Sequence, residues 1–117
     1  MTPAPVIPEI VRQHAEMAAF LWIVYDDALL HPEENPEMDE VRIARLIERL
    51  EAHLDGLRVA RADGLRIAKE RYSEFPEAGE LFVLRMLEPS ATRTRVSDLD
   101  LAKVRAFLAA HVEKQEP

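Results

Sequence analysis

The fold of this chain is decided by the stretch Met17-Ala18-Ala19-Phe20-Leu21-Trp22-Ile23-Val24-Tyr25. Every residue in it is apolar or aromatic, and it contains the only Trp of the chain. A helix that is apolar on all sides is normally buried on most of them. We therefore expect a central helix here, and we expect the other amphipathic segments to pack their single apolar stripes against it.

Prolines mark both ends of this central helix. Pro8 suits the first helical position, and Glu9 places a negative charge in the first turn, where it complements the helix dipole. His31 precedes Pro32, and a residue before proline avoids helical backbone angles. The sequence therefore predicts a helix from Pro8 to about Leu30.

Four further helices are indicated by apolar residues at helical spacing. The second begins at Asn35 or a turn later at Asp39, and the pair Asp63-Gly64 ends it, with Gly64 as the residue after the helix. The later helices are expected at residues 65–73, 76–88 and 98–113. No segment alternates apolar and polar residues as a half-buried strand does. The predicted fold class is all-α, with about five helices in HEAT-like stacked hairpins or a compact bundle.

The composition favours one globular domain over residues 1–117. The chain is 48% hydrophobic and 32% charged, and it is rich in the helix formers Ala, Leu, Glu and Arg. It has no Cys, which excludes disulfides and zinc sites built from thiolates. Its start lacks the basic residues of a signal peptide, and the apolar run is about half of a membrane span. We expect a cytoplasmic protein that binds no membrane.

The net charge of −7 comes from one segment. Residues 26–40 hold seven of the 22 acidic residues and no Lys or Arg, so the other 15 acids balance the 15 basic residues. This balance argues against nucleic-acid binding, which needs a basic face. An acidic loop is more often a solvated surface, and its functional interpretation is recognition of a basic partner. With the arginines that follow, the candidate partner surface is Asp26, Asp27, Glu33, Glu34, Glu37, Asp39, Glu40, Arg42, Arg45 and Arg49.

The sequence shows no pattern typical of catalysis or metal binding. A helical di-metal site uses Glu-x-x-His, and none of His14, His31, His53 and His111 has a Glu three residues before it. The glycines are isolated, so no phosphate-binding loop is present, and no Ser lies in a glycine-flanked nucleophile motif. We therefore expect no catalytic, cofactor-binding or metal-binding residues, and a protein that is not an enzyme.

Two stretches carry a family resemblance. The first is continuous from residue 7 to residue 22 and reads Ile7-Pro8-Glu9-Ile10-Val11-Arg12-Gln13-His14-Ala15-Glu16-Met17-Ala18-Ala19-Phe20-Leu21-Trp22. The second is Leu50-Glu51-Ala52-His53-Leu54-Asp55-Gly56-Leu57-Arg58-Val59-Ala60. Together they resemble the N-terminal region of an uncharacterised family of bacterial HEAT-repeat-containing proteins, often encoded near type VI secretion components. The resemblance covers roughly residues 7–88, while residues 89–117 diverge. Family members continue through further helical repeats, so this chain is a truncated piece, a short relative or a stand-alone N-terminal domain.

Three hypotheses for function follow. The resemblance implies a non-enzymatic protein–protein interaction scaffold or adaptor, accessory to type VI secretion and acting through the charged surface above. The first alternative is a small helical ligand-binding protein or enzyme with a pocket near Trp22 and Tyr25, using Asp26 or His14 as its polar group. The second is a structural homodimer that buries the apolar excess of the central helix between two copies.

Overall fold

The computed structural model describes residues 7–89 and 94–113, and within these ranges the chain forms α-helices and no β-strand. This confirms the all-α prediction. Residues 1–6, 90–93 and 114–117 of the predicted domain lie outside the described part. Among the described residues, no helix has the length and apolar character needed to cross a membrane. The α-helices are α1 (Pro8–Leu30), α2 (Glu40–Val59), α3 (Ala62–Glu74), α4 (Ala78–Met86) and α5 (Leu101–Glu113).

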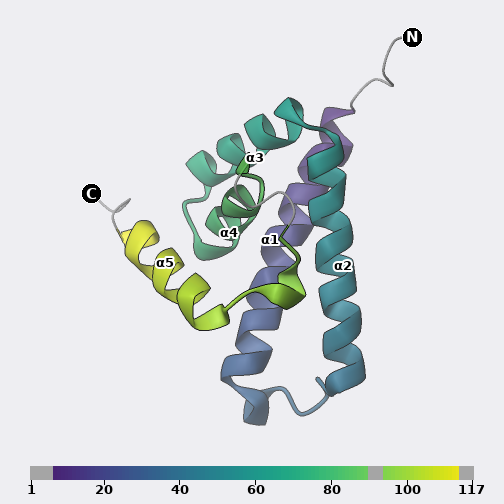
Figure 1. Cartoon of the computed structure of the whole chain (residues 1–117), viewed down its shortest axis with the longest axis vertical. Helices are drawn as coiled ribbons and strands as arrows, with labels where there is room; N and C mark the ends of the chain where they lie inside the picture. The colour runs from purple at the N-terminus through teal and green to yellow at the C-terminus, as the bar shows by residue number, and fades with distance from the viewer. Residues whose placement is uncertain (1–6, 90–93, 114–117) are drawn as a thin grey trace.

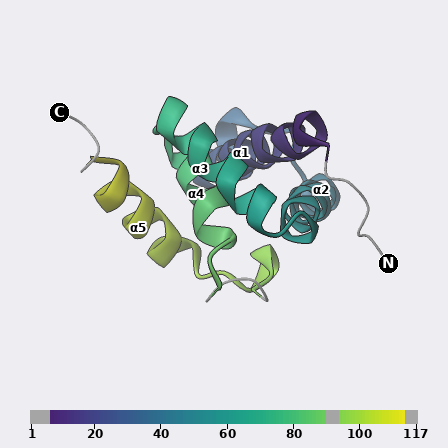
Figure 2. The ribbon, with the colours of Figure 1, turned by 90° about the horizontal axis from the view of Figure 1, so that it is seen from above.

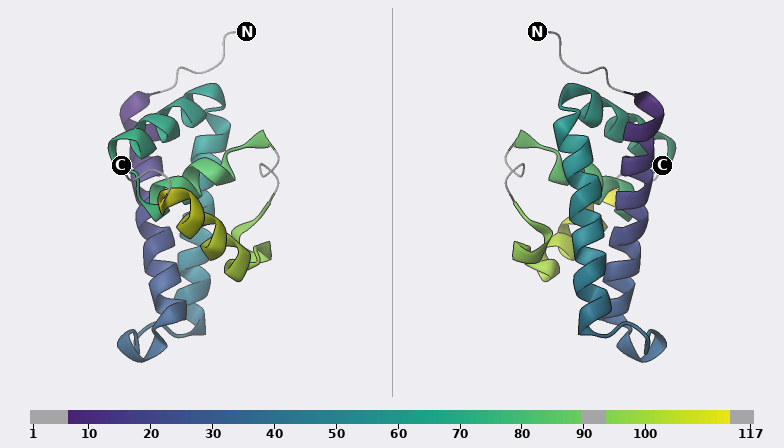
Figure 3. Two further views of the ribbon diagram at one scale, coloured as in Figure 1. Left: turned by 90° about the vertical axis from the view of Figure 1, so that its left-hand side faces the viewer. Right: turned by 90° about the vertical axis from the view of Figure 1, so that its right-hand side faces the viewer.

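The two longest helices, α1 and α2, run side by side as an antiparallel pair (Figures 1 and 3). Seen from above, α3 and α4 lie on one side of α1, and α5 lies beyond them, farthest from α2 (Figure 2). The helix α1 contacts α2, α3 and α4, as expected for the central element. In contrast, α5 packs mainly on α4, so the last helix is the one that does not lie along α1.

Small residues allow α4 to approach α1 closely. Ala18 and Ala19 of α1 are buried, and a Cβ added to Gly79 of α4 would lie 2.6 Å from the carbonyl oxygen of Ala19. One turn further along, the Trp22 ring stacks on the Phe82 ring with centroids 4.1 Å apart. The only Trp of the chain therefore fills the core between α1 and α4.

Local chemistry sets the ends of α1 and the start of α2. The helix α1 begins at Pro8 and ends at Leu30, as predicted. Of the two predicted starts for α2, the structure has the later one, because the Asp39 side chain accepts a hydrogen bond from the Arg42 amide at 2.9 Å. An Asp at the N-cap satisfies one of the amides that a helix start leaves unpaired.

The predicted boundary between α2 and α3 at Asp63-Gly64 is wrong. The turn lies at Ala60 and Arg61, and Gly64 is inside α3. A Cβ on Gly64 would lie 2.1 Å from the Leu57 carbonyl oxygen, so this glycine serves a close helix contact. The turn itself uses Arg61 at φ 54°, a left-handed conformation that usually favours glycine.

Two later boundaries also differ from the prediction. The helix α4 begins at Ala78 instead of Pro76, because Glu77 is still extended. Before α5, residues Val96–Asp98 form a separate 3-10 turn, η3, and Leu99 is extended, so α5 begins at Leu101 instead of about 98.

A partly buried ion cluster fastens η3 to α2. Arg58 and Glu51 are 13% and 14% exposed and lie 3.4 Å apart, and Glu51 also accepts a hydrogen bond from the Val96 amide at 2.9 Å. Arg58 donates to the Thr94 carbonyl oxygen at 3.3 Å. The segment that leads into α5 is thus held by charged side chains of α2.

Candidate interaction surface

One face of α1 remains open to solvent. Phe20 is 59% exposed and Ile23 is 47% exposed, although both belong to the run that the sequence predicts to be mostly buried. The cause is that α2, α3 and α4 cover the sides of α1 that carry Ala15, Ala18 and Trp22, and no described helix covers the side that carries Phe20. Exposed apolar residues next to one another are typical of a binding surface.

A groove between α1 and α2 lies on one side of Phe20. It has a volume of about 400 Å³. Its apolar lining comes from both helices and the connection between them, and its polar lining consists only of arginines. The lining residues are Phe20, Leu21, Val24, Met38, Leu46, Arg42, Arg45 and Arg49. We call this hollow the arginine groove.

Two of the three arginines have no acidic partner in the described part of the chain. Arg42 pairs with Asp39 at 3.5 Å. No carboxylate in residues 7–89 and 94–113 forms a salt bridge with Arg45 or Arg49, and both side chains are exposed. Because guanidinium groups bind carboxylates in a fixed two-point geometry, these unpaired groups are suited to an acidic ligand.

A second hollow lies on the other side of Phe20. Its volume is about 300 Å³, and Ile23 and Phe75 line it together with Phe20. Its polar lining is mixed in sign, since Arg71 stacks over the Phe75 ring at 4.2 Å and donates to Glu16 at 3.4 Å. Phe20 therefore stands on a ridge between two hollows, and only the arginine groove is lined by charge of a single sign.

Glu80 is the one buried acid that lines the second hollow. It is 8% exposed, and burial raises its pKa, with Glu77 adding to the effect and Arg71 opposing it. A carboxyl group with a raised pKa is more easily kept neutral, and a neutral carboxyl group costs less to desolvate beside an apolar ligand than a charged one does.

The predicted acidic residues have different surroundings, and of the three arginines Arg42 contacts them, through Asp39 and the Glu37 carbonyl oxygen. Asp26 is 23% exposed and binds Arg105 of α5 at 2.5 Å, which joins α1 to α5. Asp39 caps α2. The others lie at the end of the α1–α2 pair that is away from α3 (Figure 1), and we call them the acidic tip. They are Asp27, Glu33, Glu34, Glu37 and Glu40.

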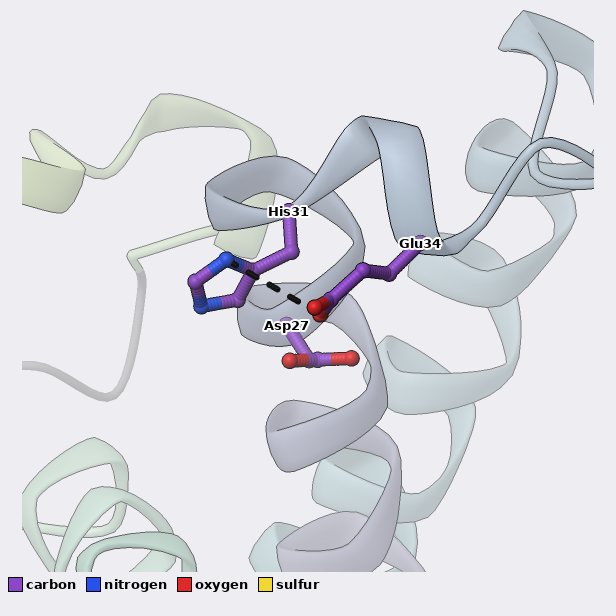
Figure 4. A group of neighbouring side chains, drawn as sticks. All are labelled: Asp27, His31 and Glu34. Carbon is purple, nitrogen blue, oxygen red and sulfur yellow. Dashed lines mark ion pairs between the residues drawn. The ribbon is translucent and has the colours of Figure 1, made fainter.

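Within the acidic tip, Asp27, His31 and Glu34 converge (Figure 4). Their donor atoms lie within 4.8 Å of one another, and His31 Nδ1 is 4.0 Å from Glu34 Oε2 and 3.9 Å from Glu33 Oε1. Asn35 donates to Asp27 at 3.2 Å and to the His31 carbonyl oxygen at 2.9 Å.

Divalent cations bind imidazole nitrogens and carboxylate oxygens. Without a metal, the positive charge of a protonated imidazole at position 31 is the alternative way to balance the carboxylates of Asp27 and Glu34. All three side chains are exposed. The Glu-x-x-His pattern does not detect this group, because His31 follows Asp27 by one helical turn and Glu34 approaches from the connection between α1 and α2. That the chain has no metal-binding residues stays a prediction.

His14 and His53 form a second pair that the sequence did not reveal. Their Nδ1 atoms are 2.9 Å apart and their ring centroids 5.2 Å apart. The centroid distance exceeds the Nδ1–Nδ1 distance by about two ring radii, one for each imidazole. The two nitrogens therefore point at one another. One must donate and the other accept, and two protonated rings cannot keep this contact. Burial lowers the pKa of His53, and His14 and then Arg49 lower it further.

The structure does not form a pocket at Trp22 and Tyr25. Trp22 is 1% exposed and Tyr25 is 7% exposed, so both are core residues. A hollow of about 460 Å³ lies between α4 and α5, on the other side of Phe82 from Trp22. Its rim carries Arg85, Lys103 and Thr94, and its walls are Phe82, Met86, Leu99, Val104, Phe107 and Leu108.

Comparisons of the chain with protein-family models, with curated proteins and with solved structures found no match. The candidate function therefore rests on the geometry of the chain itself. That geometry offers apolar contact and guanidinium groups on one face of the α1–α2 pair, which suits recognition of another molecule.

Proposed function

We propose that this chain is a non-enzymatic protein–protein interaction module that serves as a scaffold or adaptor. The observation that carries the proposal is the open face of α1, where Phe20 is 59% exposed between two hollows. A solvent-exposed Phe contributes nothing to the core, whereas buried aromatic residues dominate the binding energy of protein interfaces. The partner covers the face of α1 that the chain itself leaves open.

The cellular context of the proposal comes from the family resemblance of roughly residues 7–88. It supports a bacterial cytoplasmic protein that assists type VI secretion, with the α1–α2 pair as a HEAT-like hairpin. In this role the module joins another component through shape and charge, and it transfers no chemical group.

Site-specific photocrosslinking tests the proposal. A benzophenone amino acid replaces Phe20 in the full chain, in the cell that encodes it, and Ala109 of α5 is the matched exposed helical control position. We expect a discrete crosslinked product from position 20 and none from position 109. Equal products at the two positions, or none at position 20, would refute an interaction face on α1. A product of twice the mass of the 13.4 kDa chain would identify the homodimer instead.

A second candidate function is binding of an amphipathic small molecule between α4 and α5. The observation that favours it is a hollow with apolar walls and two cationic groups, Arg85 and Lys103, at its rim. Ligand sites of this size are mostly apolar with a few placed polar groups. Phe82 lines this hollow and stacks on Trp22, so a ligand bound in the hollow should change Trp22 fluorescence. Titration with a medium-chain fatty acid tests this. A neutral detergent of equal chain length is the control.

A further inference from the structure

We propose that the arginine groove binds an acidic amphipathic helix of a partner protein. This inference rests on the proposed function and names the class of partner. The partner helix inserts apolar side chains against Phe20 and Val24, and its carboxylates bind Arg45 and Arg49.

The shape of the groove favours a helix over an extended segment. The groove lies between two α-helices whose backbone groups are bonded within each helix, so it offers no free edge with which a strand could pair. An extended segment would leave its own amides unpaired there. A helix satisfies its own backbone and packs its ridges of side chains into the groove between the two helices.

The register of the arginines sets the spacing of acids on the partner. Arg45 and Arg49 are one turn apart on α2, which corresponds to a rise of about 6 Å. Carboxylates on a helix reach two such groups when they are three or four residues apart. We therefore expect a Glu or Asp pair at that spacing, beside apolar residues that face Phe20.

The acidic tip determines at which end of the partner helix its acidic residues lie. Arg42 is already paired with Asp39 and donates to the Glu37 carbonyl oxygen at 2.7 Å, and Glu40 is the first residue of α2 at that end of the groove. Carboxylates on the partner would be repelled there and attracted at Arg49. The acids of the partner helix therefore lie at the Arg49 end, and its other end is neutral or basic.

A displayed peptide library tests this class of partner. The library consists of amphipathic helices of about 18 residues, with leucines fixed along one face and flanking positions randomised among Glu, Lys, Gln and Ala. It is selected against the full chain. We expect enrichment of Glu at positions three or four apart, and we expect the double variant Arg45→Glu, Arg49→Glu to enrich Lys there instead. The same acids enriched by both proteins, or no charge preference, would overturn the proposal.

Affinity measurements on the best acidic peptide provide the matched controls. Arg49→Glu should weaken binding about tenfold or more, since it replaces an attraction with a repulsion. Lys69→Glu changes an exposed helical cation on α3 by the same charge, and it should have little effect. Phe20→Ala should also weaken binding about tenfold without a change in charge. Equal effects of the Arg49 and Lys69 variants would overturn the proposal, and a melting curve of each variant excludes loss of folding as the cause.

Failure of the acidic-helix proposal can be distinguished from failure of the proposed function. If photocrosslinking at position 20 captures a partner while the library shows no acidic preference, the interaction module stands and the acidic helix is wrong. If two copies of the chain are crosslinked and the peptide does not compete, the occupant of the groove is a second copy, and the acidic helix is wrong again.

Discussion

Replacement of Gly64 by alanine tests whether α2 and α3 approach as closely as the structure shows. A Cβ at this position would lie 2.1 Å from the Leu57 carbonyl oxygen and 3.0 Å from the Leu57 carbonyl carbon. Ordinary contact begins at 3.4 Å, so α3 has to move away by about 1.3 Å. The obstacle is backbone, which cannot rotate aside as a side chain can.

Two opposing terms determine the size of the effect. Alanine in a helix is favoured over glycine by about 1 kcal/mol, so helix propensity alone predicts that Gly64→Ala is stabilising. Forcing extra atoms into a packed contact costs about 1–3 kcal/mol, and a backbone obstacle places this case at or above the upper limit. We expect a net loss of about 2 kcal/mol, which lowers the melting temperature of a domain of this size by about 10 °C.

Thermal and denaturant unfolding of Gly64→Ala and two comparison variants measure this effect. In Gly56→Ala the new Cβ would lie 2.7 Å from the His14 ring. That ring is a side chain and can rotate away, so this variant should lose less stability than Gly64→Ala. Ala44→Gly on the exposed face of α2 calibrates the propensity term, with an expected loss of about 1 kcal/mol. If Gly64→Ala is as stable as the original chain, or more so, the close approach of α2 and α3 does not exist and the reasoning fails.

Three further predictions concern single contacts. Arg61→Gly should raise the free energy of unfolding by about 1 kcal/mol, because φ 54° is strained for arginine and free for glycine, and a lower denaturant midpoint would contradict this. Arg58→Ala should lower that free energy by about 2 kcal/mol, since it removes the nearer and more buried of the two cations beside the 14%-exposed Glu51 carboxylate and leaves only Arg95, at 3.8 Å; urea unfolding measures the change, and an unchanged midpoint argues against the cluster. Burial and the neighbouring His14 lower the pKa of His53, so as the pH falls below about 6.5 the unfolded chain binds more protons than the folded one, and stability decreases. Urea midpoints between about pH 7.5 and 5.5 should show this slope, and His53→Gln should flatten it; an equal slope in both proteins would contradict the assignment.

The candidate site was only partly predictable from the sequence. The sequence predicts the arginines at 42, 45 and 49 as part of a partner surface, because charge content is visible in a linear sequence. For their apolar neighbour Phe20 the sequence predicts burial, because an uninterrupted apolar run does not show which side of a helix stays uncovered. Asp26 was assigned to the same charged surface, but it binds Arg105 of α5, a residue 79 positions away.

What the sequence determined by itself is local. Pro8 and the His31-Pro32 pair delimit α1, and Asp39 starts α2, because backbone angles and capping bonds involve residues a few positions apart. The apolar spacing likewise determined an all-α fold.

The tertiary structure alone decided which contacts those helices make. The placement of Gly64 at a helix crossing, the pairing of His14 with His53 and the open side of α1 each depend on how separate helices meet. The number of helices that cover α1 decides which of its apolar residues are buried. Phe20 is exposed for that reason, since packing between distant segments, and not hydrophobicity alone, decides burial.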